Sequence, residues 1–153
     1  MYVGIDIEQF VRDPYGSGIQ RVLQYLAEDR PAQEVQADFV VPMGAGFGLL
    51  SPRQAADLIG IAFRPRAADS DLRLLVAESL AEMRPIVVKP GDLLAIYDTW
   101  LLTEVSYLPS VLERFELFAK CVPTAMIGYD TLPMSEPANY RFKPGAAAWV
   151  SEY

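Results

Sequence analysis

Short continuous apolar runs alternate along this chain with segments in which apolar residues recur at helical spacing. This alternation predicts strands separated by helices. YVGID at residues 2–6 is a short apolar run ending at a carboxylate, so it indicates a buried strand, with a polar loop after it. From Gly18 to about Asp29 apolar residues return at helical spacing. VQADFVVPM at residues 35–43 predicts a second strand, and the glycine-rich GAGFG at residues 44–48 predicts an open loop after it.

The second half of the chain continues the alternation. Ser51 and Pro52 suit the cap and first position of a short helix that runs to about Ile59. A further helix is expected from near Ser70 until Pro85 stops it. The remaining elements are a strand at 93–97 ending at Asp98, a helix at 103–120, a strand at 122–130 ending at Asp130, and a loop or linker from 131 to 153.

This order of elements is typical of an α/β domain with a mainly parallel sheet and helices on both faces. The chain has 153 residues, of which 52% are hydrophobic, so residues 1–153 are expected to form one domain with a full core. Ligands of open parallel sheets bind outside the carboxyl ends of the strands. Asp6, Asp98 and Asp130 each end a predicted strand, which makes that edge the candidate site.

Composition narrows the chemistry that such a site can perform. The net charge of −7 disfavours binding to nucleic acid or to anionic lipid. The chain has no histidine, which removes the usual general base and the commonest zinc ligand. The single cysteine, Cys121, excludes a disulfide framework and is expected to be buried. No signal peptide or membrane-spanning stretch is recognised, so a soluble, cytoplasmic protein is expected.

The segment GSGIQR, residues 16–21, lies where a loop becomes a helix. It is not a dinucleotide fingerprint, because Arg21 stands in place of the third glycine and the predicted strand ends ten residues earlier. Two interpretations stay open. Either Gly16 and Gly18 let the helix start approach an anion, with Arg21 adding a charged contact, or the glycines serve only the turn and Arg21 is a solvated residue.

The strand-end acids and nearby aromatic residues have similar alternatives. Asp98 and Asp130 suit acid chemistry in a cleft, or they cap the next helix or turn. Trp100 and Tyr129 suit stacking on a sugar, although packing in the core is the commoner role of an aromatic side chain. DSD at residues 69–71 imitates an Asp-X-Asp metal signature, but its place at a helix start favours capping, and no metal site is expected.

Three segments in order, DIEQFVRDPYGSGIQRVLQYL, PGDLLAIYDTW and MIGYDTLPMSEPANY, resemble the N-terminal domain of family-4 (group 1) glycosyltransferases. The resemblance covers nearly the whole chain. It implies the first Rossmann-like half of a two-domain GT-B architecture. Such enzymes transfer a hexose from a nucleotide sugar to a glycan or lipid-linked acceptor, with retention at the anomeric carbon and without a metal or other cofactor.

The resemblance also assigns roles to residues of this sequence. Residues of the helix-start motif, which would face the diphosphate and sugar of the donor, are Gly16, Ser17, Gly18, Gln20 and Arg21. Asp98 and Asp130 would line the reacting cleft as catalytic candidates, and Asp6, Trp100 and Tyr129 would contact the acceptor. Many relatives carry His-Asp where this chain has Tyr129-Asp130, so the role of that histidine does not carry over.

The second half of such an enzyme, which binds most of the donor, is not among these 153 residues. The expectation is therefore a domain that is inactive by itself and completed by a C-terminal domain, with weak membrane association at most. The alternative is a self-contained, non-enzymatic α/β binding or regulatory module.

Overall fold

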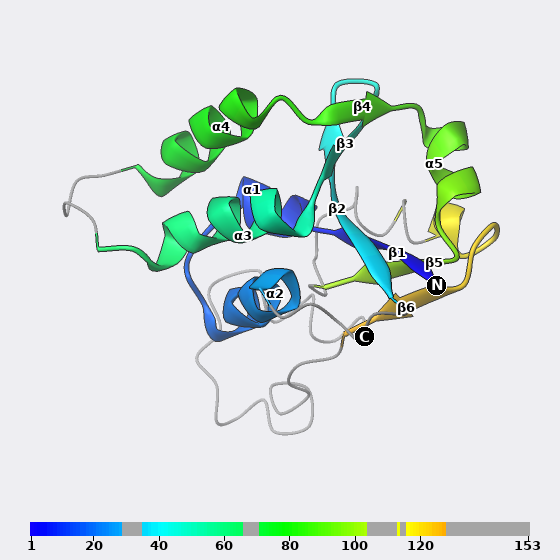
Figure 1. Ribbon diagram of the computed structural model, residues 1–153, viewed down its shortest axis with the longest axis horizontal. Helices are drawn as coiled ribbons and strands as arrows, with labels where there is room; N and C mark the ends of the chain where they lie inside the picture. Colours follow the sequence, from blue (N-terminus) through cyan, green and yellow to red (C-terminus); the bar gives the residue numbers. More distant parts are fainter. Residues whose placement is uncertain (29–34, 66–70, 104–112, 114–115, 128–153) are drawn as a thin grey trace, which may run out of the picture.

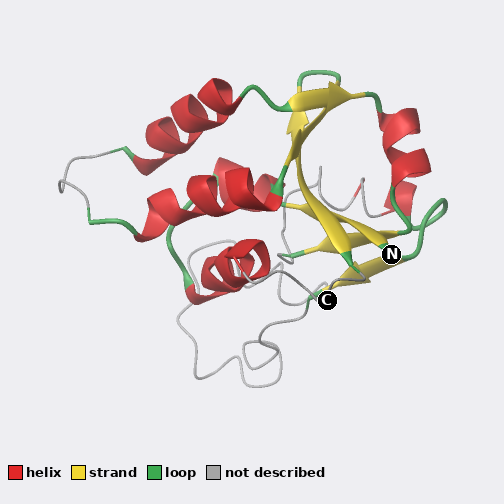
Figure 2. Ribbon diagram, viewed as in Figure 1, coloured by secondary structure: helices red, strands yellow, loops and turns green. Residues whose placement is uncertain are grey.

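The computed structural model describes residues 1–28, 35–65, 71–103, 113 and 116–127, which form an α/β fold around one six-stranded sheet. The strands lie in the order β4-β3-β2-β1-β5-β6 (Figure 1). Helices cover both faces of this sheet (Figure 2). The α/β class and the mainly parallel sheet predicted from the sequence are confirmed, and the arrangement is consistent with a Rossmann-like fold.

Four strands form the parallel part of the sheet: β1 (Tyr2–Asp6), β2 (Gln36–Met43), β5 (Thr99–Leu102) and β6 (Thr124–Met126). β1 pairs with β2 on one side and with β5 on the other, and β5 also pairs with β6. The strands predicted at 2–6 and 35–43 are therefore confirmed. The strand predicted at 122–130 is shorter, and its expected last residue, Asp130, lies outside the described residues.

The glycine-rich stretch after β2 is a tight turn, so the open loop predicted at 44–48 is wrong. Gly44 has a positive φ of 57°, which a glycine adopts without steric cost. The chain then returns as β3 (Gly46–Leu50), antiparallel to β2. β4 (Ile86–Val88) pairs antiparallel with β3 and is the edge strand on this side. The hydrophobic pattern missed β3 because two glycines interrupt its apolar run.

One face of the sheet is covered by helices from the first half of the chain. These are α1 (Glu8–Arg12), α2 (Gly18–Glu28), α3 (Pro52–Gly60), the short 3-10 helix η1 (Ile61–Phe63) and α4 (Leu72–Met83). Val3 and Ile5 of β1 point into this layer and share a core with buried residues of the helices. The polar loop predicted directly after the first strand is wrong, because α1 begins at Glu8.

Two of these helices begin with side-chain caps. Ser51 forms a capping box with Gln54 at the start of α3, which confirms the predicted helix there. At α4 the cap is Asp71, whose carboxylate accepts from the amides of Arg73 and Leu74. The DSD segment therefore does cap a helix, through Asp71. The capping roles expected of Asp69 and Ser70 stay predictions, because both lie outside the described residues.

The opposite face is covered by α5 (Pro90–Ile96) and by a cluster of aromatic side chains around Trp100. The strand predicted at 93–97 is wrong, because residues 93–96 belong to α5, Tyr97 follows the helix as its C-cap, and the strand begins later, at Thr99. A short apolar run does not distinguish a buried strand from a buried helix by itself. Pro90 in the first turn favours the helix here, since a proline costs nothing at that position.

The connection from β5 to β6 is described only in part. Glu113 and residues 116–118 are helical, as predicted, and the rest of the helix expected at 103–120 lies outside the described residues, apart from Thr103 and the turn that begins at 119. Cys121 is exposed, so its predicted burial is wrong. Among the helices of the described residues, none is long and apolar enough to cross a membrane.

Asp38 of β2 joins two tyrosines near the edge of the sheet where the parallel strands begin. Its Oδ2 accepts from the hydroxyl of Tyr2 at 2.6 Å and from that of Tyr97 at 3.0 Å. The hydrogen bond to Asp38, with burial adding to it, raises the pKa of Tyr2 to about 12. Burial, followed by the charge of Asp38, also raises the pKa of Tyr97. Deprotonation of either phenol would place a second negative charge beside this carboxylate.

Stability should consequently fall at alkaline pH, and Asp38 should be the reason. A tyrosine whose pKa is raised on folding stabilises the protein fully below the unfolded pKa of about 10. For Tyr2 that contribution is lost as the pH rises through about 12. Tyr2→Phe should lower the urea midpoint at pH 7 and reduce its further decline between pH 9 and 11. The exposed Tyr25 is the matched control, and equal pH dependence in Tyr2→Phe and Tyr25→Phe would contradict this account.

Candidate functional site

Buried polar residues gather where the parallel strands end, an edge called here the carboxyl edge. In the described part of the chain the buried polar or charged side chains are Asp6, Glu8, Gln20 and Thr103, all at most 5% exposed. Asp6 ends β1, Thr103 directly follows β5, and Glu8 and Gln20 belong to the helices after β1. Burying such groups is costly unless they are hydrogen-bonded, so this concentration marks a specialised region.

The carboxyl edge also contains the point at which the strand order of the sheet reverses. From β1 the chain goes through α1 and α2 to β2 on one side, whereas β5 and β6 lie on the other side of β1. The strand order thus reverses between β1 and β5, and the carboxyl end of such a switch point is where open α/β sheets bind ligands. Asp6 and Thr103 lie at this point, and the Thr103 hydroxyl donates to the Asp6 carbonyl oxygen at 2.8 Å.

The two acids near the switch point, Asp6 and Glu8, interact with other groups of the protein. Asp6 Oδ1 accepts from the amide of Glu8 at 3.0 Å, at the start of α1. Glu8 is ion-paired with Arg12, one turn later, at 2.7 Å. The Asp6 carboxylate therefore helps to begin α1, and its 5% exposure leaves little of it accessible. Its predicted contact with an acceptor would require a ligand to enter below the surface.

Gly16, in the loop before α2, and Gly18, the first residue of α2, are glycines for different structural reasons. Gly16 has a positive φ of 68°, and a Cβ on it would lie 2.7 Å from the carbonyl oxygen of Ala62. Gly16 is therefore needed by the fold, because the loop packs against the end of the α3–η1 segment. A Cβ on Gly18 would meet no atom of the described residues within 4 Å, apart from its chain neighbours and its own helix. Gly18 is exposed, so the described residues leave the start of α2 accessible to a ligand.

Gln20 holds the loop in place from within. Its side chain is 1% exposed, and its Oε1 accepts from the amides of Tyr15 at 2.8 Å and Gly16 at 2.9 Å. Its Nε2 donates to the carbonyl oxygen of Asp13 at 2.9 Å. One amide group thus satisfies three backbone groups of a loop that has no regular structure. In the structure, Gln20 therefore holds the conformation of the loop. From the sequence, Gln20 was expected to contact the donor.

Ser17 and Arg21 lie at the start of α2 itself. The Ser17 hydroxyl accepts from the amide of Gln20 at 3.2 Å, as a helix cap does. The guanidinium of Arg21 lies 4.3 Å above the centre of the Phe63 ring, in a cation–π contact that keeps it at the surface beside the loop. Gly16, Ser17, Gly18, Gln20 and Arg21 are thereby brought together, as predicted from their shared motif.

Asp98 is not part of this group, and its placement at a strand end is wrong. It precedes β5, at the edge where the parallel strands begin. Its carboxylate accepts from the amide of Tyr2 at 2.7 Å, and its own amide donates to the Tyr2 carbonyl oxygen at 2.9 Å. The length of β1, about 13 Å at roughly 3.3 Å per residue, separates Tyr2 from Asp6. Asp98 therefore cannot share a rim with the start of α2.

The remaining predicted residues are either buried or outside the described residues. Trp100 is 1% exposed and packs edge-on against Phe118 and Tyr97, so its indole belongs to the core and presents no face to a sugar. Tyr129 and Asp130 lie outside the described residues. In the described part of the chain no group of three or more acidic, cysteine or histidine residues could hold a metal ion.

Three residues at or beside the carboxyl edge were missed from the sequence. Glu8 and Arg12 are spaced as an i,i+4 ion pair on a helix, a signal that was hidden by the prediction of a loop there. Thr103 follows β5 directly, so it becomes recognisable once the strand is placed at 99–102.

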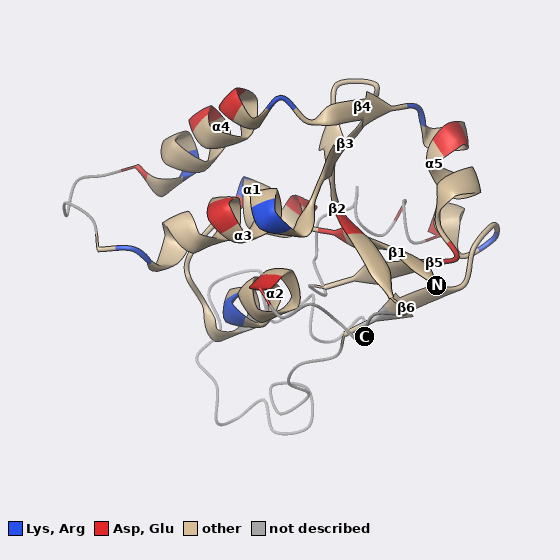
Figure 3. Ribbon diagram, viewed as in Figure 1, with Lys and Arg blue, Asp and Glu red and all other residues tan. Residues whose placement is uncertain are grey.

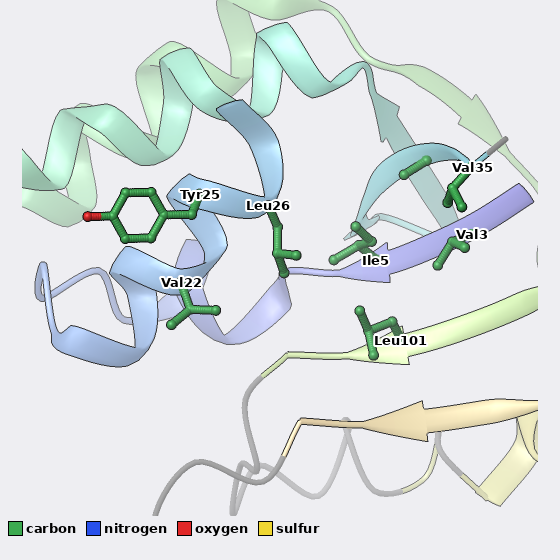
Figure 4. Close-up of a pocket in the computed structure, with 8 residues that line it drawn as sticks. Val3, Ile5, Val22, Tyr25, Leu26, Val35 and Leu101 are labelled. Carbon is green, nitrogen blue, oxygen red and sulfur yellow. The ribbon is translucent and has the colours of Figure 1, made fainter. Parts of the chain in front are cut away.

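An apolar pocket of about 360 Å³ lies between α2 and strands β1 and β5 (Figure 4). Val3, Ile5, Leu26 and Leu101 are among its lining residues, and the Tyr25 hydroxyl points away from it. A diphosphate needs charged or N–H donors, which these side chains do not supply. The chemistry of the described residues therefore favours the start of α2, and not this pocket, for a polar ligand.

Replacing the two glycines separately should distinguish their roles. Gly16→Ala should destabilise the protein by more than about 1 kcal/mol, because an alanine is disfavoured at positive φ and its Cβ approaches a carbonyl oxygen. Gly18→Ala should change the free energy of unfolding by at most about 1 kcal/mol, and in the stabilising direction, since alanine is the better helix former. Urea unfolding measures both, and equal losses would contradict the assignment.

Removing the Gln20 amide should cost stability through the groups it leaves unpaired. Gln20→Leu keeps an apolar stem of similar length but deprives two amides and one carbonyl oxygen of their partner. We expect a loss of about 2–3 kcal/mol. Gln24→Leu on the same helix is the control, since among the described residues Gln24 bonds only to exposed Glu28, and should cost under about 0.5 kcal/mol. Similar losses in both variants would show that Gln20 does not hold the loop.

Comparison of the chain with family models, curated proteins and solved structures finds no match. The resemblance to glycosyltransferases therefore rests on the sequence motifs alone. What these residues establish is a mainly parallel α/β sheet with a polar switch point beside an accessible helix start.

Proposed function

We propose that this chain forms one wall of the active-site cleft of a glycosyltransferase that transfers a hexose from a nucleotide sugar to a glycan or lipid-linked acceptor. The observation that carries the proposal is the exposed Gly18 at the start of α2, beside which the described residues leave space, next to the switch point where the buried polar residues gather. A helix start presents unpaired amides and the positive end of the helix dipole, which together suit the diphosphate of a donor.

The roles within the site follow from the contacts on this wall. The backbone at Ser17 and Gly18 approaches the diphosphate, and Arg21 supplies a positive charge from its position over Phe63. Gln20 and Gly16 fix the loop that leads to these amides. Asp98 takes no part, since it lies at the opposite edge of the sheet. The resemblance alone assigns the acid role to Asp130 and the acceptor contact to Tyr129, which lie outside the described residues, whereas Asp6 is buried and supports the start of α1.

One wall supplies only part of what the reaction needs. Negative charge develops on the departing nucleoside diphosphate, and it is stabilised best by donors already oriented around it. The described residues offer one arginine and a few amides for this purpose. The proposal therefore includes a second, donor-binding domain on the other side of the cleft, and the 153-residue chain alone should be inactive and bind a donor weakly.

Titration with uridine diphosphate, followed by amide NMR shifts and calorimetry, tests this proposal on the chain itself. We expect binding weaker than micromolar, with the largest shift changes at the amides of residues 17–19. Gly18→Val should abolish these changes and leave the fold intact, because a side chain there meets open space and would occupy the place of the ligand.

Two results would count against the proposal. Micromolar binding by the chain alone would contradict the division of the site between two walls. Shift changes centred on Asp98 and Tyr2, at the far edge of the sheet, would remove the start of α2 from the site.

A further inference from the structure

The edge strand β4 carries unusually exposed apolar side chains. Ile86 is 72% exposed and Val87 is 57% exposed, on opposite faces of the strand. β4 pairs with β3 on one side, and none of the described strands pairs with its other side (Figure 1). In an antiparallel pair, alternate residues direct their N–H and C=O groups away from the partner strand, so the outer side of β4 retains hydrogen-bonding capacity.

A positive charge stands at each end of this strand. Arg84 and Lys89, both exposed, flank Pro85–Val88, and basic residues lie on either side of β4 in Figure 3. Neither has an ion-pair partner among the described residues. The nearest acids in the sequence, Glu82 and Asp92, belong to α4 and α5. In the sequence, Arg84 and Lys89 are closer to the ends of β4 than these acids are, so positive charges are the nearest charges on both sides of the exposed apolar side chains.

The same charges make a second copy of this chain an unfavourable partner. If two β4 strands paired antiparallel about Val87, Lys89 of each copy would lie near Arg84 of the other, because both flank the strand at similar distances. Like charges close together across paired strands are destabilising. Charged residues and prolines beside a short edge strand are a common protection against such self-association. If the partner strand instead carried acidic residues at both ends, its contacts with Arg84 and Lys89 would be attractive.

We propose that β4 is a docking site for an extended peptide segment of another protein, with two or three apolar residues at its centre and acidic residues at both ends. The segment adds to the sheet as a further strand outside β4. Its backbone pairs with the outer side of β4, its apolar side chains cover Ile86 and Val87, and its acids lie beside Arg84 and Lys89. This surface is separate from the start of α2, so the inference stands independently of the glycosyltransferase proposal.

A synthetic peptide with the sequence Glu-Glu-Val-Ile-Val-Glu-Glu, capped at both ends and labelled with fluorescein, is a suitable probe. Its anisotropy in a titration with the chain should show saturable binding that weakens as salt rises, because the flanking charge pairs are exposed. The double substitution Arg84→Glu and Lys89→Glu should weaken binding at least about tenfold and should allow binding of the matching peptide with lysine flanks.

Matched controls separate this docking from non-specific attraction. The double substitution Arg64→Glu and Lys120→Glu changes the net charge equally at exposed positions outside β3 and β4 and should leave binding unchanged. A peptide with proline at its central position lacks the amide needed for strand pairing and should not bind.

Three outcomes would overturn the proposal. These are absence of binding by the acidic peptide, equal binding by the proline peptide, and equal loss in both double variants. Concentration-dependent dimerisation of the chain that is blocked by Val87→Glu would instead assign this edge to a second copy.

Discussion

The indole of Trp100 lies against the backbone of β1, and this contact requires that Gly4 has no side chain. A Cβ on Gly4 would lie 2.7 Å from the indole and 2.9 Å from the Tyr97 ring. Gly4 and Trp100 are also register partners in the pairing of β1 with β5. The contact therefore sets how β5 lies beside β1, and with it the switch point at the far end of the same two strands.

Burial of β1 on both faces explains why both proposed sites lie at edges of the sheet. Val3 and Ile5 face the helices α1 to α4, whereas Gly4 faces the aromatic cluster, so neither face of this strand is available to a polar ligand. Backbone and side-chain polar groups become accessible where the strands end. The carboxyl edge is the more specialised of the two edges, because buried polar groups meet the start of α2 there. At the opposite edge, Asp38 and Asp98 connect elements of the fold.

The proposed cleft and the proposed docking strand use different parts of the same sheet. The cleft uses the ends of the parallel strands, where an open helix start suits an anion. The docking surface uses the side of the antiparallel addition β3–β4, which extends the sheet beyond β2. Neither site requires the other. The loop before α2 is held by Gln20 and Gly16, and it follows β1, which is separated from β4 in the sheet by β2 and β3.

The sequence by itself determined the class of the fold, the first two strands, the starts of α2 and α3, and the grouping of residues 16–21. These features depend on local spacing, capping residues and chain neighbours, which a sequence displays directly. Tertiary structure alone decided that residues 93–96 form a helix, that Asp98 lies away from Asp6, and that Trp100 is buried. A short apolar run is compatible with either kind of element, so its conformation depends on the partners against which it packs. Gly16 and Gly18 show the same division, because the sequence presents two similar glycines and only the packing of the loop against Ala62 distinguishes them.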